Sequence, residues 1–168
     1  MRTLTRPSAA ARAGIRNKLW SDLLSRRRPL ASLYPFDTLE RIDLVKNGVP
    51  AGLLMLISED MAISKDMLYA TIGLARATVN RTLREQQALN QDESERVLGM
   101  ARLIGQVSTI VGESGDPEGF DAAKWVAAWL DRPLQALGGR RPAELMDTAD
   151  GRGLVSDLVA RMQTGAYA

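Results

Sequence analysis

The segment from Ile63 to Leu89 constrains the fold more than any other stretch, because it predicts two short helices joined by a glycine turn. Ser64 is a good N-cap for the first helix, and Gly73 can adopt the left-handed conformation that ends it. A second helix is expected to begin near Arg76. This is a helix-turn-helix pattern, in which the apolar positions that would fix the angle between the helices are Leu68, Ile72, Leu74, Val79 and Leu83.

The second of these helices carries polar side chains whose chemistry suits DNA. Arginine can donate a bidentate fork to guanine or bind phosphate, asparagine can pair with adenine, and threonine can contact a phosphate or a thymine methyl group. A helical hairpin with a basic exposed face also occurs without any such role, so a purely structural hairpin is the alternative. The candidate DNA-binding residues are Arg76, Thr78, Asn80, Arg81 and Arg84.

Further helices are predicted on both sides of this pattern. Asp37 and Glu40 have the spacing of a capping box, which predicts a short helix ended by Gly48. Its apolar face is expected to hold Leu39, Ile42 and Val45, and an apolar core helix should follow Pro50. A second capping box, Asn90 to Glu93, is expected to open a long helix whose end extends into a dimer contact. The apolar stripe of this long helix is Val97, Leu98, Ala101, Ile104, Val107 and Val111.

Residues 1–30 concentrate the positive charge of the chain. They hold eight basic residues and one acidic residue, a net charge of +7, whereas the whole chain has a net charge of +2. This asymmetry is typical of a basic arm for an acidic partner such as nucleic acid, although a transit peptide can look similar. Part of the arm is expected to pack on the domain or on a second subunit, and a solvated terminus is the alternative. The residues for such packing are Ile15, Leu19, Trp20, Leu23 and Leu24.

A glycine-rich linker, GESGDPEG, is expected to separate a smaller C-terminal region. In this region Trp125 is expected to anchor the core, with Trp129 shared between the core and its edge. A last helix, capped by Thr148 or Asp150, should end at Gly165. The predicted organisation is a basic arm at 1–35, a helix-turn-helix domain at 36–111, a linker at 112–119 and a small helical domain at 120–168.

The sequence contains neither cysteine nor histidine. Disulfides, thiolate nucleophiles, the usual zinc sites and histidine acid-base chemistry are therefore excluded, so we expect no enzyme, no cofactor and no metal site. Clustered acids such as Asp147, Asp150 and Asp157 are better explained by helix capping and solvation. No apolar run approaches the length of a membrane span, and we expect a cytoplasmic protein without membrane contact.

Two regions resemble a known family. The C-terminal region contains Trp125, the run LGGRRP at residues 137–142, the run LMDT at 145–148 and the closing residues 165–168, GAYA. In this order they resemble the toxin-binding domain of the Xre/MbcA/ParS family of antitoxins. The helix-turn-helix and its continuation ESERVLGMARL resemble the Xre-like domain of the same family. The resemblance covers about residues 36–168 and leaves the basic arm outside.

This resemblance implies an all-α protein in which an Xre-like helix-turn-helix domain precedes a small helical toxin-binding domain. It implies a type II antitoxin whose partner is a RES-domain toxin, with a fold akin to ADP-ribosyltransferases and an activity on NAD. The C-terminal tail would occlude the active site of the toxin, and the helix-turn-helix would bind the operator DNA of its own operon, as a homodimer. The alternative is a transcription regulator whose C-terminal domain binds another protein or dimerises.

The tail is small and uncharged, with one amphipathic ring, Tyr167, that could fill a pocket on a partner. The resemblance makes the two arginines of the LGGRRP run candidates for toxin contacts, although Arg141 could equally cap its own short helix or remain solvated. The candidate toxin-binding residues are Arg140, Arg141, Met162, Gly165, Ala166, Tyr167 and Ala168.

Overall fold

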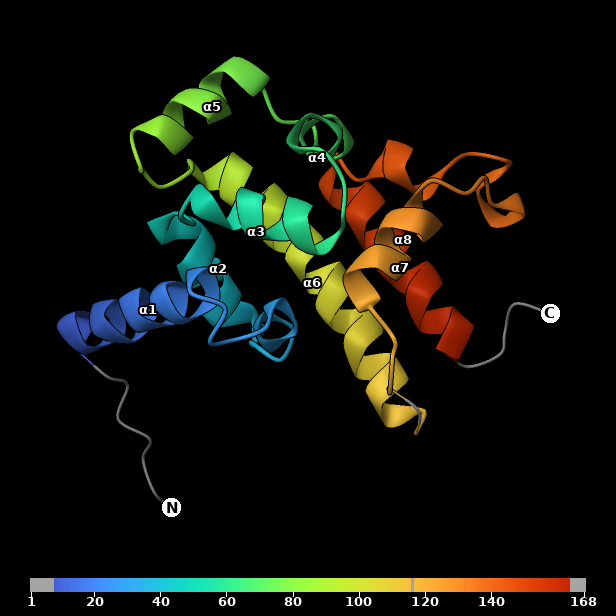
Figure 1. The fold of residues 1–168 in the computed structure, drawn as a ribbon, viewed down its shortest axis with the longest axis horizontal. Helices are drawn as coiled ribbons and strands as arrows, with labels where there is room; N and C mark the ends of the chain where they lie inside the picture. The colour runs from blue at the N-terminus through green and yellow to red at the C-terminus, as the bar shows by residue number, and fades with distance from the viewer. Residues whose placement is uncertain (1–7, 116, 164–168) are drawn as a thin grey trace.

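The computed structural model describes residues 8–115 and 117–163, and helices in this part of the chain surround one long central helix (Figure 1). The only extended pairing within those ranges is an isolated bridge between Pro50 and Ala88. The all-α prediction is therefore confirmed. The α-helices are α1 (Ala9–Leu24), α2 (Thr38–Asn47), α3 (Gly52–Asp60), α4 (Lys65–Ile72), α5 (Arg76–Arg84), α6 (Gln91–Glu113), α7 (Ala122–Leu130) and α8 (Ala149–Gln163), and the short 3-10 helices are η1 (Leu30–Leu33), η2 (Gln135–Leu137) and η3 (Pro142–Leu145).

Both predicted capping boxes are present. The side chain of Asp37 accepts a hydrogen bond from the Glu40 amide at 2.8 Å, and Glu40 accepts one from the Asp37 amide at 2.9 Å. Asn90 and Glu93 exchange the same pair of bonds at 2.9 and 3.0 Å. Each box satisfies amides that a helix start would otherwise leave unpaired, which fixes where α2 and α6 begin.

Helix α6 is the central element, with α1, α2 and α3 on one side and α7 and α8 on the other (Figure 1). Its apolar stripe packs against η1, α2, α7 and α8 of the same chain. Near the end of α6, Ile110 packs on the core and Val111 is half-buried, so the expected dimer contact there stays a prediction. One hydrophobic core joins buried residues from α1 through α8.

The segments before α3 and after α5 are joined through their backbones. The Leu89 amide donates to the Val49 carbonyl at 2.8 Å, and the Ala51 amide donates to the Gln87 carbonyl at 3.2 Å. The buried Ser94 hydroxyl accepts from the Val49 amide and donates to the Leu89 carbonyl, at 3.0 and 3.2 Å. These bonds close α3, α4 and α5 into one unit on the start of α6.

The basic arm packs on the domain rather than lying free from residue 8 onward. Leu19, Trp20 and Leu23 are buried, and α1 contacts α3. The expected inward positions of Ile15 and Leu24 are wrong, since Ile15 is 65% exposed and Leu24 is 43% exposed. The buried residues of α1 all lie in its C-terminal half, whereas its start projects toward the edge of the molecule (Figure 1).

The apolar face of α2 also differs from the sequence expectation. Leu44 is the buried residue, whereas Leu39 is 59% exposed and Ile42 is 42% exposed. Leu39 and Ile15 instead line an open cavity of about 600 Å³ between α1 and α2. Ile15 and Leu39 are therefore exposed apolar residues that share one groove.

The two tryptophans of α7 have roles opposite to those expected. Trp129 is buried at 5% exposure, whereas Trp125 is only partly buried. The inward face of α7 is set by Val126 and Trp129, which are three residues apart, and Trp125 lies beside that face. Its ring stacks on that of Trp129 at a centroid distance of 5.7 Å.

Candidate DNA-binding and partner-binding surfaces

The predicted helix-turn-helix is formed by α4 and α5. The Ser64 hydroxyl accepts from the Met67 amide at 3.1 Å and so caps α4, and Gly73 ends this helix with a left-handed φ of 70°. Leu68, Ile72 and Val79 are fully buried. The turn chemistry and the apolar contacts between the helices are therefore as the sequence predicts, although α5 ends at Arg84, earlier than the pattern indicates.

The exposed face of α5 presents three of the five candidate DNA-binding side chains without any bond to the rest of the described chain. These residues are Thr78, Arg81 and Arg84. Arginine at exposed positions of a second helix is suited to phosphate or guanine, because its planar fork is not neutralised by a carboxylate. The structure thus leaves these three side chains available to a ligand.

The other two candidates, Arg76 and Asn80, bond to side chains of α4 within the helix-turn-helix. Arg76 forms an ion pair with Asp66 at 3.1 Å, between the starts of α5 and α4. Asn80 is half-buried, and its side-chain oxygen Oδ1 accepts a hydrogen bond from the Tyr69 hydroxyl at 3.4 Å. Burial and the nearby Asp66 raise the pKa of Tyr69, while Arg76 acts in the opposite sense, so the hydroxyl stays a donor at neutral pH. Arg76 and Asn80 therefore help to fix the geometry of the motif.

Arg96, which is not among the five candidate residues from the sequence, supports the turn between α4 and α5. Its guanidinium donates to the carbonyls of Ile72 and Gly73, at 3.3 and 3.1 Å, and pairs with Asp92 at 3.1 Å. The last carbonyls of α4 are thus satisfied from α6. Arg96 lies in the run ESERVLGMARL, but no local pattern indicates which backbone atoms it meets.

The C-terminal region touches the helix-turn-helix at the same turn. A Cβ placed on Gly73 would lie 2.9 Å from the Cβ of Asp147, which follows η3. Contacts also join α4 with η3. The two functional regions are therefore in direct contact at Gly73.

The two candidate arginines of the C-terminal region differ in their bonding. Arg141 pairs with Asp131 at 2.9 Å, and its amide donates to Glu144 at 3.3 Å, so this residue stabilises its own fold. Arg140 is exposed, and its side chain forms no ion pair with other described residues, whereas its carbonyl accepts from the Leu134 amide at 3.0 Å. Arg140 is therefore the more accessible of the two for a partner.

Helix α8 is held on α6 by three side-chain contacts along its length. Arg152 bonds Glu95 at 3.1 Å, and the Ser156 hydroxyl donates to the buried Gln106 at 2.8 Å. Gln163 donates to Glu113 at 3.3 Å. Met162 is partly buried and packs on the core, whereas the candidates Gly165, Ala166, Tyr167 and Ala168 lie outside the described residues. The last described turn of α8 is thus fixed against the end of α6.

Two other features, a metal-binding cluster and a membrane-spanning helix, are not found in the part of the chain that the structure describes. Within residues 8–115 and 117–163, no three acidic side chains are grouped in a way that could hold a metal ion. No helix in the same ranges is both long enough and apolar enough to cross a membrane. Asp147, Asp150 and Asp157 do not form a metal-binding cluster in this part of the chain.

The fold and these surfaces define a helix-turn-helix protein with a small helical domain packed against it. Residues 40–102 match the family model of the antitoxin Xre-like helix-turn-helix domain, and residues 118–165 match that of the antitoxin Xre/MbcA/ParS C-terminal toxin-binding domain. The chain belongs to the Xre/MbcA/ParS family of antitoxins.

Relatives along most of the chain carry antitoxin names. A protein from Sphingobium named "Prs ADP-ribosylating antitoxin" is 40% identical over 137 residues, which cover 82% of this chain and 86% of the relative. A protein from Yersinia enterocolitica named "Antitoxin Xre" is 24% identical over 126 residues, covering 75% of this chain and 80% of the relative. These matches agree with the domain order expected from the sequence.

Proposed function

We propose that this chain neutralises a RES-domain toxin with its C-terminal region and represses its own operon through the helix-turn-helix. The observation that carries this proposal is the separation of the two surfaces. Helix α5 lies at one end of the molecule and the last described turn of α8 lies at the other (Figure 1). Operator DNA and a toxin can therefore be bound by one chain without competing for the same surface.

The toxin side of the proposal depends on the position of α8. Because Gln163 bonds Glu113 and Met162 packs on the core, the segment that follows α8 starts from a fixed point. From there residues 165–168 would enter the active site of the toxin, while Arg140 contacts its surface. The ADP-ribosylation in the name of the Sphingobium relative agrees with a partner that acts on NAD.

The DNA side depends on Thr78, Arg81 and Arg84, which are exposed on α5. One helix-turn-helix reads a single half-site, so operator binding calls for two copies related by a two-fold axis. We propose a homodimer that presents two α5 helices. The exposed apolar residues Ile15 and Leu39 offer a surface for it in addition to the end of α6.

The experiment that tests occlusion is truncation after Gln163, in cells that also express the toxin encoded beside this gene. The shortened chain should lose neutralisation, because the occluding residues are gone, yet it should still co-purify with the toxin and bind the promoter. Arg132→Ala is the matched control, since Arg132 is exposed and has no ion pair within the described chain. Unchanged neutralisation by the truncated chain would contradict occlusion.

Two further results of the same experiment separate the remaining alternatives. If the truncated chain neither neutralises nor co-purifies with the toxin, the tail serves to attach the partner rather than to block its active site. If the full chain binds the promoter but never co-purifies with the toxin, the protein is a transcription regulator whose C-terminal domain serves another protein or dimerisation.

A further inference from the structure

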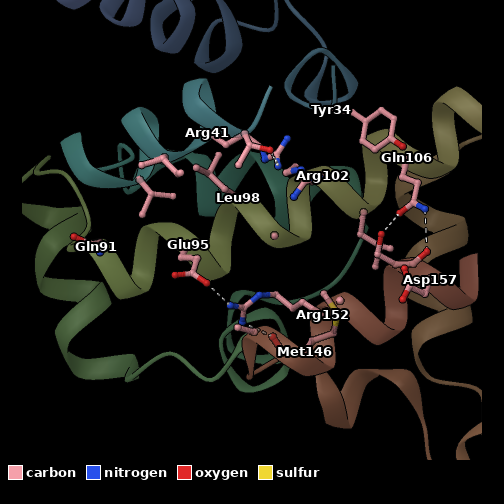
Figure 2. Close-up of a pocket in the computed structure, with 18 of the residues that line it drawn as sticks. Tyr34, Arg41, Gln91, Glu95, Leu98, Arg102, Gln106, Met146, Arg152 and Asp157 are labelled. Atoms are coloured by element: carbon pink, nitrogen blue, oxygen red, sulfur yellow. Dashed lines mark hydrogen bonds and ion pairs between the residues drawn. The ribbon is translucent and has the colours of Figure 1, made fainter. Parts of the chain in front are cut away.

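A cavity of about 650 Å³ lies between α2, α6 and α8, away from the exposed face of α5 (Figure 2). Four basic side chains and two acidic ones from the described residues line it, so its charged lining is net positive. The basic residues are Arg41, Lys46, Arg102 and Arg152, and the acidic residues are Glu95 and Asp157. The cavity is large enough for a small organic molecule, since ligand sites span about 300–1,000 Å³.

Arg102 is half-buried in this cavity. It lies on α6 next to Leu98 and Leu103, and its Nε is buried without a hydrogen bond to any described residue. No carboxylate in this part of the chain forms an ion pair with it. Burial, and then the positive charge of Arg41, lower the pKa of Arg102. Arg102 as a whole is half-buried, and no carboxylate of the described chain offsets its charge.

Arg41 brings a second guanidinium to the same wall of the cavity (Figure 2). It donates to the Phe36 carbonyl at 2.7 Å and to the Thr38 hydroxyl at 3.0 Å, so it is fixed at the start of α2. Neither of these acceptors carries a full charge. Two like charges thus face the same cavity without an anionic partner, and an anion between them would offset their repulsion.

The acidic residues of the lining do not supply this anion. Glu95 is bonded to Arg152, as the dashed line in Figure 2 marks, and Arg152 also donates to the Met146 carbonyl at 3.1 Å. Asp157 is exposed and forms no ion pair with Arg41 or Arg102. Tyr34, which also lines the cavity, carries a phenol and supplies no carboxylate.

We propose that this cavity is a binding site for a small phosphorylated molecule, with its phosphate between Arg41 and Arg102. Two planar guanidinium groups match the several oxygens of a phosphate and neutralise its double charge. The buried side chains of Leu98 and Leu103 provide an apolar wall for an organic group attached to the phosphate. Because Arg152 and Ser156 of α8 also line the cavity, a ligand that fills it would contact both the helix-turn-helix part and the C-terminal part of the chain.

The test is thermal unfolding and calorimetric titration of the full chain with inorganic phosphate, ADP and adenosine, at constant ionic strength. Phosphate and ADP should raise Tm in a saturable manner, whereas adenosine, which has no charge, should not. Tighter binding of ADP than of phosphate identifies an organic phosphate as the ligand. Equal affinities identify phosphate alone as the recognised group, and both results support the site.

Variants at Arg102 distinguish a ligand-binding arginine from a structural one. Arg102→Met removes a half-buried charge that has no ion pair within the described chain, so it should raise Tm without ligand and weaken phosphate binding at least about tenfold. Arg102→Lys should retain part of the binding, and Arg81→Met, at an exposed arginine of α5, should retain all of it. An apo Tm that falls in Arg102→Met, with ligand binding unchanged, would overturn the proposal.

Two other outcomes also overturn it. Absence of saturable binding by both phosphate and ADP would show that the cavity takes no free phosphorylated molecule. If, in addition, Arg102→Met weakens association with the toxin, the counter-charge for Arg102 is an acidic group of that partner. Loss of phosphate binding in Arg81→Met would place the anion on the surface of α5 instead.

Discussion

Arg152 on α8 lies directly over Gly99 on α6, so that a Cβ at Gly99 would fall 2.6 Å from its Cδ. The absence of a side chain at Gly99 allows Arg152 to cross α6 and bond Glu95 at 3.1 Å. The Arg152 side chain is only 12% exposed, whereas that of Glu95 is 51% exposed, so the pair is shielded from solvent on the arginine side. One glycine thus permits the contact that fastens the C-terminal helix to the centre of the molecule.

Gly99→Ala should therefore destabilise the chain, although alanine is the better helix former. The new methyl group would displace Arg152, break its bond to Glu95 and leave the Met146 carbonyl without its donor. We expect a loss of about 1–2 kcal/mol in the free energy of unfolding, measured with urea. Gly112→Ala, in the same helix but with no atom within 4 Å, should be neutral or stabilising. Equal behaviour of the two variants would show that Arg152 adapts without cost.

Helix α8 offers a second comparison between two glycines. A Cβ at Gly151 would overlap the Leu145 carbonyl oxygen and lie 2.7 Å from the Thr148 hydroxyl, whereas a Cβ at Gly153 would meet no atom within 4 Å. Gly151→Ala should cost about 2–4 kcal/mol, because the obstacle is backbone, and Gly153→Ala should stabilise by about 0.5–1 kcal/mol. Chemical denaturation of both variants measures this contrast, and a stable Gly151→Ala chain would contradict the packing of η3 on α8.

The sequence predicts those features of the fold that depend on neighbours in the chain. Asp37 with Glu40 and Asn90 with Glu93 form their capping boxes because the bonding atoms are three residues apart. Gly73 ends α4 because left-handed backbone favours glycine wherever the rest of the fold lies. These local rules hold without knowledge of the tertiary structure.

The incorrect predictions concern which side of a short helix faces the core. Ile15 and Leu39 follow helical spacing, but they are exposed because they line an open groove between α1 and α2. Trp125 and Trp129 are equally apolar, and only the position of α7 on the core distinguishes them. The meeting of Arg41 and Arg102 likewise depends on α2 packing against α6, which no sequence motif indicates.

The N-terminus of α7 should make stability depend on pH in the acid range. Bonding to the Lys124 side chain, and then to its backbone amide, lowers the pKa of Asp121. Because the folded pKa lies below the unfolded one, this contribution is fully present above the unfolded pKa and is lost as pH falls through the folded one. Asp121→Asn, which can still cap α7, should remove this dependence.

The measurement is Tm of the wild type and of Asp121→Asn between about pH 6 and pH 2, across the ordinary aspartate pKa. The advantage of the wild type should shrink as the pH falls. It should also be smaller in high salt, because the side chains of Asp121 and Lys124 are 45% and 62% exposed. A Tm difference that stays constant throughout this range would show that Asp121 does not titrate differently in the folded chain.

DNA binding through α5 should depend on salt in proportion to the arginines that reach phosphate. Arg81 and Arg84 are exposed and free of ion pairs within the described chain, so each is expected to displace about one counterion from DNA. Replacing both by alanine should flatten the slope of log K against log salt by about 2 per subunit. Arg76→Ala should have a smaller effect, since Arg76 already pairs with Asp66.

The measurement is a salt titration of promoter binding followed by fluorescence anisotropy, with Arg132→Ala as the control. Arg132 is also exposed and has no ion pair within the described chain, but it follows α7 in the C-terminal region, so its removal takes away one positive charge without touching α5. If the Arg132 variant flattens the slope as much per charge as the Arg81 and Arg84 variants do, the attraction comes from the overall charge. A slope that changes only in the α5 variants assigns the phosphate contacts to this helix.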